Sequence, residues 1–230
     1  PHVSKDYIGP TASVQVLADL ANPIGAEVSG SGKEEVKRIG IPLWVHRRCL
    51  NPMFSIANKI AYNNKMVLAN KKVGKGKWFS YKGTTTNAQY VPEQGEFIVQ
   101  CFQKYFKENN NELPNLFVIT PFTAVKDELK AILRKNRPDQ VSSTDFNTWI
   151  NKSIGTVHTF QGKEANIVYF VTGTDNDTDG AANWSCQKPN LLNVAVTRAK
   201  KEFHVVGDLN RFKEKLYYDD IVRFFKEFDK

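Results

Sequence analysis

Short apolar runs alternate with amphipathic segments over the second half of this chain, and this alternation limits its possible folds more than any other feature. Apolar, partly β-branched runs predict strands at Leu116–Thr120, Ser153–Val157, Ile167–Thr172 and Phe203–Gly207. Helical spacing of apolar residues predicts helices at Ala124–Lys135, Asn190–Lys200, Arg211–Leu216 and Ile221–Phe228. Alternating strands and helices form a parallel sheet with both faces covered. The sequence therefore predicts an α/β fold, with ligands at the carboxyl ends of its strands.

Glycine and proline interrupt the N-terminal part of the chain, so we treat residues 1–40 as a connecting segment with one helix, Ser13–Leu20. A strand at Ile41–Val45 is expected to open the main domain, residues 41–230. Three further segments complete this outline, namely helices at Pro52–Tyr62 and Pro92–Lys107 and a polar loop at Gly173–Pro189.

The composition is typical of a globular protein, with 41% hydrophobic and 24% charged residues. No apolar run reaches the roughly 20 residues that span a bilayer, and no signal peptide opens the sequence, so no membrane partner is expected. The three cysteines lie far apart and show neither a disulfide framework nor zinc spacing, which predicts a cytoplasmic protein without a metal site. A net charge of +8 suits a nucleic-acid partner, but equally a protein that is merely soluble.

The segment Thr156–Glu164 is the most informative stretch for function. It combines a strand end, a Gln-Gly pair and a carboxylate. Gly162 lets the backbone approach a phosphate or ribose, and Glu164 can accept hydrogen bonds from sugar hydroxyls. The plain alternative is a glycine turn that joins two strands.

Two arginine-bearing segments accompany it. Arg198, in Asn193–Lys200, could complement a helix dipole, or reach a γ-phosphate as an arginine finger. Arg47 and Arg48 follow the Ile41–Val45 strand, where paired arginines form a solvated rim or bind phosphate through both nitrogens. All three segments are expected at the carboxyl ends of strands.

The order and spacing of these segments resemble superfamily 1 helicases, in the branch that contains senataxin and the nonsense-mediated-decay RNA helicase. Thr156–Glu164 resembles motif V of that family, Asn193–Ala199 motif VI, and Phe117–Phe122 the motif IV strand. His46-Arg47 falls where the family usually has Tyr-Arg, and the imidazole can still stack on adenine. Ungapped reading from there places Asn58 on a common helix asparagine of the family, which favours Arg47 over Arg48 as the first phosphate-sensing arginine. The similarity covers roughly residues 41–210.

This resemblance implies a second RecA-like domain without its own phosphate-binding loop. Arg47 and Arg198 would act on ATP held, with Mg²⁺, by an N-terminal RecA-like domain of the same protein. The residues implied to contact the nucleotide are Gln161, Gly162, Glu164, Arg47 and Arg198. The residues implied to line a path for single-stranded nucleic acid are Thr120, Pro121, Thr156, His158 and Thr159.

Other patterns carry less weight. Gly30–Lys33 and Gly74–Lys77 imitate a phosphate loop but lack the required glycine and hydroxyl residue. Asp175–Gly180 copies half of a calcium loop, without the glutamate at its twelfth position. The basic stretch Lys65–Lys82 holds three aromatic residues, either to stack on bases or to form a hairpin whose rings face the core.

The leading hypothesis is the C-terminal motor domain of an ATP-dependent DNA or RNA helicase, inactive without its partner domain. One alternative is a nucleic-acid-binding module that keeps the fold but has no motor activity. A second is an unrelated α/β nucleotide-binding enzyme.

Overall fold

The computed structural model describes residues 17–18, 21, 25–28, 37–40, 44–70 and 72–229. The chain divides into two compact units, residues 1–45 and 46–230. In the first unit, β1 (Gly25–Val28) and β2 (Lys37–Gly40) pair antiparallel. Most of the predicted helix Ser13–Leu20 and of the predicted strand Ile41–Val45, and all of Gly30–Lys33, lie outside the described residues.

Five strands of the second unit form one sheet, and every adjacent pair in it is parallel. Its strands are β5 (Lys75–Ser80), β6 (Leu116–Thr120), β7 (Ile154–Thr156), β8 (Ala165–Val171) and β9 (Ala199–Gly207). The spatial order is β5-β9-β8-β6-β7, so β5 and β7 are the edge strands. A small separate sheet joins β3 (Val45–His46) and β4 (Val67–Leu68).

Helices connect these strands. The α-helices are α2 (Met53–Tyr62), α3 (Pro92–Glu108), α4 (Thr123–Lys135), α5 (Ser143–Ser153), α6 (Asp179–Ser185), α7 (Asn190–Val196), α8 (Leu209–Phe212) and α9 (Tyr218–Phe228). The 3₁₀-helices are η2 (Val157–Phe160) and η3 (Asn176–Thr178). Within the described residues, no helix combines the length and the apolar character needed to cross a membrane.

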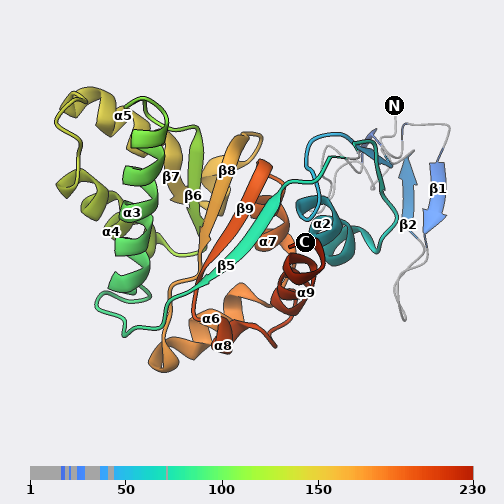
Figure 1. Ribbon diagram of the computed structural model, residues 1–230. Helices are drawn as coiled ribbons and strands as arrows, with labels where there is room; N and C mark the ends of the chain where they lie inside the picture. Colours follow the sequence, from blue (N-terminus) through green and yellow to red (C-terminus); the bar gives the residue numbers. More distant parts are fainter. Residues whose placement is uncertain are drawn as a thin grey trace, which may run out of the picture. The chain divides into compact units, whose positions relative to one another are not determined.

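Alternate side chains of the central strands enter two different cores. Val168 and Phe170 of β8 pack on the face covered by α2, α7 and α9. Tyr169 and Val171 point to the opposite face, which α3, α4 and α5 cover (Figure 1). Each fully buried apolar side chain stabilises the fold by about 1.5–3 kcal/mol, so both layers are needed. The predicted α/β fold, a parallel sheet with helices on both faces, is confirmed.

The basic stretch Lys65–Lys82 does not form the suggested hairpin, because its C-terminal half is β5, an edge strand paired with β9. Its aromatic rings do face the cores: Trp78 packs 6.2 Å from Tyr218, and Phe79 packs 4.6 Å from Phe97, centroid to centroid. Gly74–Lys77 leads into this strand, where a side chain at Gly76 would collide with Phe225. The glycines of this stretch therefore serve packing.

The predicted pattern of elements was wrong in several places. The polar loop predicted for Gly173–Pro189 contains η3 and α6. The predicted helix Asn190–Lys200 ends at Val196, because Ala199 already pairs with Ala165 of β8. Helix α5 was missed, although Ser142 caps it by accepting a hydrogen bond from the Asp145 amide.

Candidate functional site

Four charged side chains gather where β8 and β9 begin: Arg48, Glu164, Arg198 and Lys200. Glu164 is the centre of this group, because its Oε2 lies 3.2 Å from Nε of Arg48 and its Oε1 contacts Nζ of Lys200. The hydrogen bond from Lys200 lowers the pKa of Glu164, and the charges of Lys200, Arg48 and Arg198 lower it further. The carboxylate is therefore ionised at neutral pH and can accept hydrogen bonds from hydroxyl groups.

Arg198 is only 9% exposed, and each nitrogen of its guanidinium group donates a hydrogen bond within the chain. Its Nε donates to the Val194 carbonyl at 3.0 Å, and Nη1 donates to the Lys163 carbonyl at 3.0 Å. Nη2 donates to Oγ1 of Thr197, also at 3.0 Å. Burial, and then the charge of Arg48, lower the pKa of Arg198. Arg198 thus ties the turn before β8 to the end of α7.

That turn has the geometry of a type II β-turn. Gln161 has φ −58° and ψ 124°, Gly162 has φ +83°, and the Lys163 amide donates to the Phe160 carbonyl at 3.0 Å. The positive φ explains the glycine, because other residues rarely adopt it. No atom lies within 4 Å of the position that a Cβ of Gly162 would take, so this exposed turn faces open space.

Arg47 and Arg48 differ in their surroundings. Both are exposed, but it is Arg48 that contacts Glu164. The segment before α2 is fixed by His46, whose Nε2 accepts a hydrogen bond from the Cys49 amide at 3.0 Å. Burial, and then Arg48, lower the pKa of His46, so its ring is neutral, and it packs 5.5 Å from Phe54. Cys49 beneath it is completely buried.

The residues predicted to line a strand path lie at the carboxyl ends of β6 and β7. Thr120 and Thr156 are register partners there, and His158 and Thr159 are exposed on η2. Thr120 is completely buried, and its Oγ1 accepts a hydrogen bond from the Phe122 amide at 3.3 Å. Thr120 therefore shapes the turn at Pro121, and the exposed residues of this group are those that can touch a ligand.

The sequence predicted that all the arginine and carboxylate segments lie at carboxyl ends of strands, and this was wrong. Glu164 directly precedes β8, and Arg198 directly precedes β9, so both lie at amino ends. The reason is topological: β7 and β8 both run parallel to β6, so the chain must return across the sheet between them. Helix η2 and the Gly162 turn make this return. Two candidate surfaces result, one at the amino ends and one at the carboxyl ends of the parallel strands.

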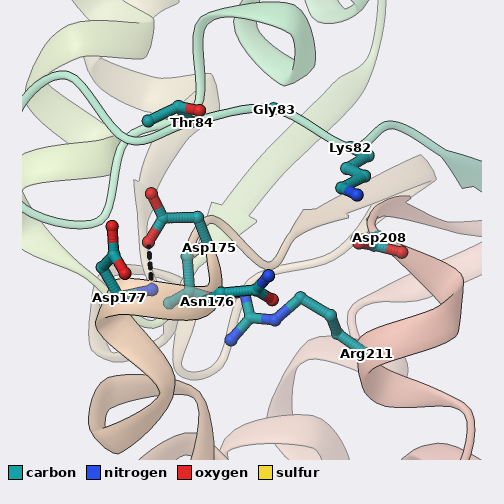
Figure 2. A pocket seen from close by; sticks show the side chains of 9 residues that line it. Lys82, Gly83, Thr84, Asp175, Asn176, Asp177, Asp208 and Arg211 are labelled. Atoms are coloured by element: carbon teal, nitrogen blue, oxygen red, sulfur yellow. Dashed lines mark hydrogen bonds between the residues drawn. The ribbon is translucent and has the colours of Figure 1, made fainter.

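A pocket of about 190 Å³ opens at the carboxyl ends of β5, β8 and β9 (Figure 2). Lys82 and Arg211 line it, together with Asp175 and its neighbours. Asp175 is tied to the chain after β5, because its Oδ2 accepts hydrogen bonds from the amide and the hydroxyl of Thr85 at 2.7 and 2.8 Å. Its Oδ1 accepts from the Asp177 amide, drawn in Figure 2. The hydrogen bond from the Thr85 amide holds the pKa of Asp175 well below its usual range. These hydrogen bonds to Asp175 fix the start of the loop after β8.

Two residues near these surfaces were not predicted from the sequence. Lys200 is the closest cation to Glu164, and its place at the second residue of β9 could have indicated this. Trp184 is 50% exposed on α6, at the carboxyl edge. No periodic pattern marks it, since it lies in a segment predicted to be a loop.

Comparison with solved structures finds similarity to viral and bacterial helicases. The arterivirus nonstructural protein 10, a helicase, has 15% identity and a TM-score of 0.36, over 73% of this chain and 26% of that protein. Its complex with DNA gives 15% identity and a TM-score of 0.38, over 82% and 29%. The C-terminal domain of a possible DNA helicase from Lactobacillus plantarum WCFS1 gives 11% identity and a TM-score of 0.40, over 70% and 87%. This chain thus spans about a quarter of the arterivirus protein.

Comparison with curated protein sequences finds no significant match. A protein-family comparison does find one, with the AAA domain family (AAA_12), and the match extends over residues 51–210. Because this match covers more than half of the 230 residues, the chain belongs to the AAA domain family.

Proposed function

We propose that this chain is the second RecA-like domain of an ATP-dependent superfamily 1 helicase, in the branch that contains senataxin. The observation that carries this proposal is the position of Arg198, which joins the Gly162 turn to α7. This junction brings an ionised carboxylate, Glu164, together with three cations at the amino ends of β8 and β9. The three cations are Arg48, Arg198 and Lys200. Such a set suits a ribose and a polyphosphate.

The chemistry of these residues fits ATP. The Glu164 carboxylate can accept hydrogen bonds from ribose hydroxyls, and the exposed Gln161–Gly162 turn lets backbone amides approach the nucleotide without steric hindrance. Arginine binds phosphate through two nitrogens, which suits Arg47 or Arg48. A preceding RecA-like domain would hold most of the ATP and its Mg²⁺. An arginine that contacts the γ-phosphate raises the rate of phosphoryl transfer by a factor of about 10³–10⁵.

Geometry and sequence resemblance favour different members of the arginine pair. The resemblance favours Arg47, whereas Arg48 is the one in contact with Glu164. On binding, ribose hydroxyls would compete for the carboxylate and release Arg48 towards phosphate. Arg47 is exposed and could reach phosphate without breaking a contact with Glu164. The two arginines are therefore tested separately.

We propose that single-stranded DNA or RNA binds at the other side of the sheet, at the carboxyl ends of the strands. Pro121 and Thr156 lie there at the ends of the adjacent strands β6 and β7, and His158 and Thr159 follow on η2. Thr120 is buried and shapes the turn at Pro121. The net charge of +8 favours a polyanion. Closing and reopening the two domains around ATP would then move the protein along the strand.

ATP turnover of the full-length protein, with and without a single-stranded oligonucleotide, tests this proposal. We expect Arg198→Lys, and either Arg47→Ala or Arg48→Ala, to lower kcat by about 10³ or more while oligonucleotide binding persists. Arg223→Ala is the matched control, because Arg223 is an exposed arginine of α9 that forms an ion pair with Asp220 and lies far along the chain from the three arginines under test. Wild-type turnover in all three variants would refute the role of the arginines.

One observation favours a second candidate, a nucleic-acid-binding module without motor activity. The guanidinium group of Arg198 already has partners for Nε, Nη1 and Nη2. A structural arginine of this kind needs no ATP. This candidate predicts salt-dependent oligonucleotide binding, no ATP turnover in the full-length protein, and no effect of Arg48→Ala on binding.

A further inference from the structure

Trp184 is exposed at a place where the surrounding structure does not require an aromatic side chain. Half of its surface is open to solvent, while its neighbours Ala182 and Ser185 on α6 are buried. The indole ring rests against Phe122, with 5.9 Å between the ring centroids and 40° between the ring planes. Phe122 directly follows Pro121, so Trp184 borders the proposed strand path.

The helix that carries Trp184 is held on several sides. At its start, Oδ1 of Asp179 lies 2.9 Å from Nη2 of Arg211 and 3.1 Å from Nζ of Lys215. Asn183 donates to the same carboxylate at 3.0 Å. The loop before the helix is fixed by Asp175, at the pocket in Figure 2. A ring held on a fixed helix loses little conformational entropy when a ligand stacks on it.

A second pocket, of about 310 Å³, lies beside this ring. Its lining residues come from η2, from the end of α6 with the loop after it, and from the start of α7: His158, Trp184, Gln187, Lys188, Asn190 and Leu191. None of these residues is acidic, Lys188 is cationic and exposed, and the two amides and the imidazole can donate hydrogen bonds. The combination of an aromatic face, a cation and hydrogen-bond donors complements a base attached to a phosphate.

We propose that Trp184 stacks on a base of single-stranded nucleic acid, and that Lys188 binds a neighbouring phosphate. This rests on the proposed function and extends its strand path from His158 across η2 to α6. Stacking on an aromatic ring tolerates any base, so this contact adds affinity without sequence preference. A single strand is the occupant that fits, because a duplex does not offer an unstacked base.

Binding of a fluorescein-labelled oligothymidylate to this chain, followed by anisotropy, provides the first test. Trp184→Ala weakens binding by about fivefold to a hundredfold, and Trp184→Phe by no more than a few fold, because phenylalanine retains a stacking face. Lys188→Ala lowers the slope of log K against log salt by about one. Leu216→Ala is the matched control, since Leu216 is a comparably exposed apolar residue at 58%.

Tryptophan fluorescence provides a readout that a purely structural role would not change. Trp44 and Trp184 are the exposed indoles among the described residues, whereas Trp78 is half-buried and Trp149 is buried. In Trp44→Phe, Trp184 is therefore the exposed indole that a ligand can quench directly, and the double variant with Trp184→Phe gives the signal of Trp78 and Trp149 to subtract. Unlabelled oligothymidylate quenches the fluorescence of Trp44→Phe at saturation, and the quenching disappears when Trp184→Phe is added. Thermal unfolding of each variant checks that the fold is retained.

The outcomes separate the two proposals. Unchanged affinity in Trp184→Ala together with unquenched fluorescence overturns the stacking inference and leaves the proposed function standing. Affinity that is lost in both Trp184→Ala and Trp184→Phe, without quenching in Trp44→Phe, identifies a structural role and also overturns it. If neither DNA nor RNA oligonucleotides bind at low salt, the proposed strand path fails and the inference fails with it.

Discussion

Replacing Arg198 by alanine should destabilise the fold, whatever its effect on catalysis. The side chain is 9% exposed and makes three hydrogen bonds of 3.0 Å, to Val194, Lys163 and Thr197. A fourth, to the Phe160 carbonyl, is long at 3.4 Å and should add little. The junction between the Gly162 turn and α7 depends on these bonds.

The expected loss follows from this count. At a net ~0.5–1.5 kcal/mol for each bond, the three good bonds contribute roughly 1.5–4.5 kcal/mol. Truncation lets water reach the Lys163 carbonyl, because Lys163 is exposed, and water repairs part of the loss. We therefore expect Arg198→Ala to lower the free energy of unfolding by about 2–3 kcal/mol. Arg198→Lys keeps the charge and one donor group, so it should lose less.

Urea denaturation of this chain, followed by circular dichroism, measures the loss as a shift of the midpoint at unchanged slope. Arg134→Ala is the control, because Arg134 is exposed and makes one hydrogen bond, to Asn147, at 2.9 Å. It should change stability by no more than about 0.5 kcal/mol. If Arg198→Ala were as stable as this control, the structural role argued for Arg198 would be wrong.

Three further predictions follow from the same structure. Asp175→Asn should cost about 1–2 kcal/mol near neutral pH. Because the Thr85 amide lowers the folded-state pKa of Asp175, this gap is full above the ordinary carboxyl pKa of about 3.9 and closes as pH falls towards the lower folded value. Urea midpoints across pH measure it, and a gap that widens in acid contradicts it. Gly162→Ala should cost about 1 kcal/mol for its φ of +83°, and Gly173→Ala more, because its Cβ would also lie 2.5 Å from a backbone oxygen; equal denaturation midpoints for the two would count against this. Burial raises the pKa of Cys49 to about 12, so an alkylating reagent at about pH 8 should modify Cys49 only after unfolding, as peptide mass spectrometry can show.

The sheet was predictable from the sequence because its central strands are apolar on both faces. β8 and β9 send residues into both cores, so their runs are nearly continuous, and Leu116–Thr120 was predicted with its observed bounds. β5 was missed because an edge strand carries charge, and its lysines masked the pairing with β9. Local patterns do not record which strand a segment will pair with.

The candidate site was predicted in its residues but not in its geometry. The sequence indicated Glu164 and Arg198, and the structure brings both to the starts of β8 and β9. Their edge was predicted wrongly, because it depends on the order of the strands in space. The contact of Glu164 with Lys200 and Arg48 joins positions that are 36 and 116 residues away along the chain. Such pairs become visible only once the sheet is assembled.

The short return from β7 to β8 has a mechanical consequence. Only Val157–Glu164 separates Thr156, at the carboxyl end of β7, from Ala165, at the amino end of β8. A 3₁₀-helix and a tight turn take up most of that length. The segment has no slack, so a displacement at one end cannot be absorbed before it reaches the other. A residue inserted into this segment would let it lengthen, so that a displacement at one end is partly absorbed before it reaches the other. Any coupling of ligand affinities that passes through it must be reciprocal, equal in free energy in both directions.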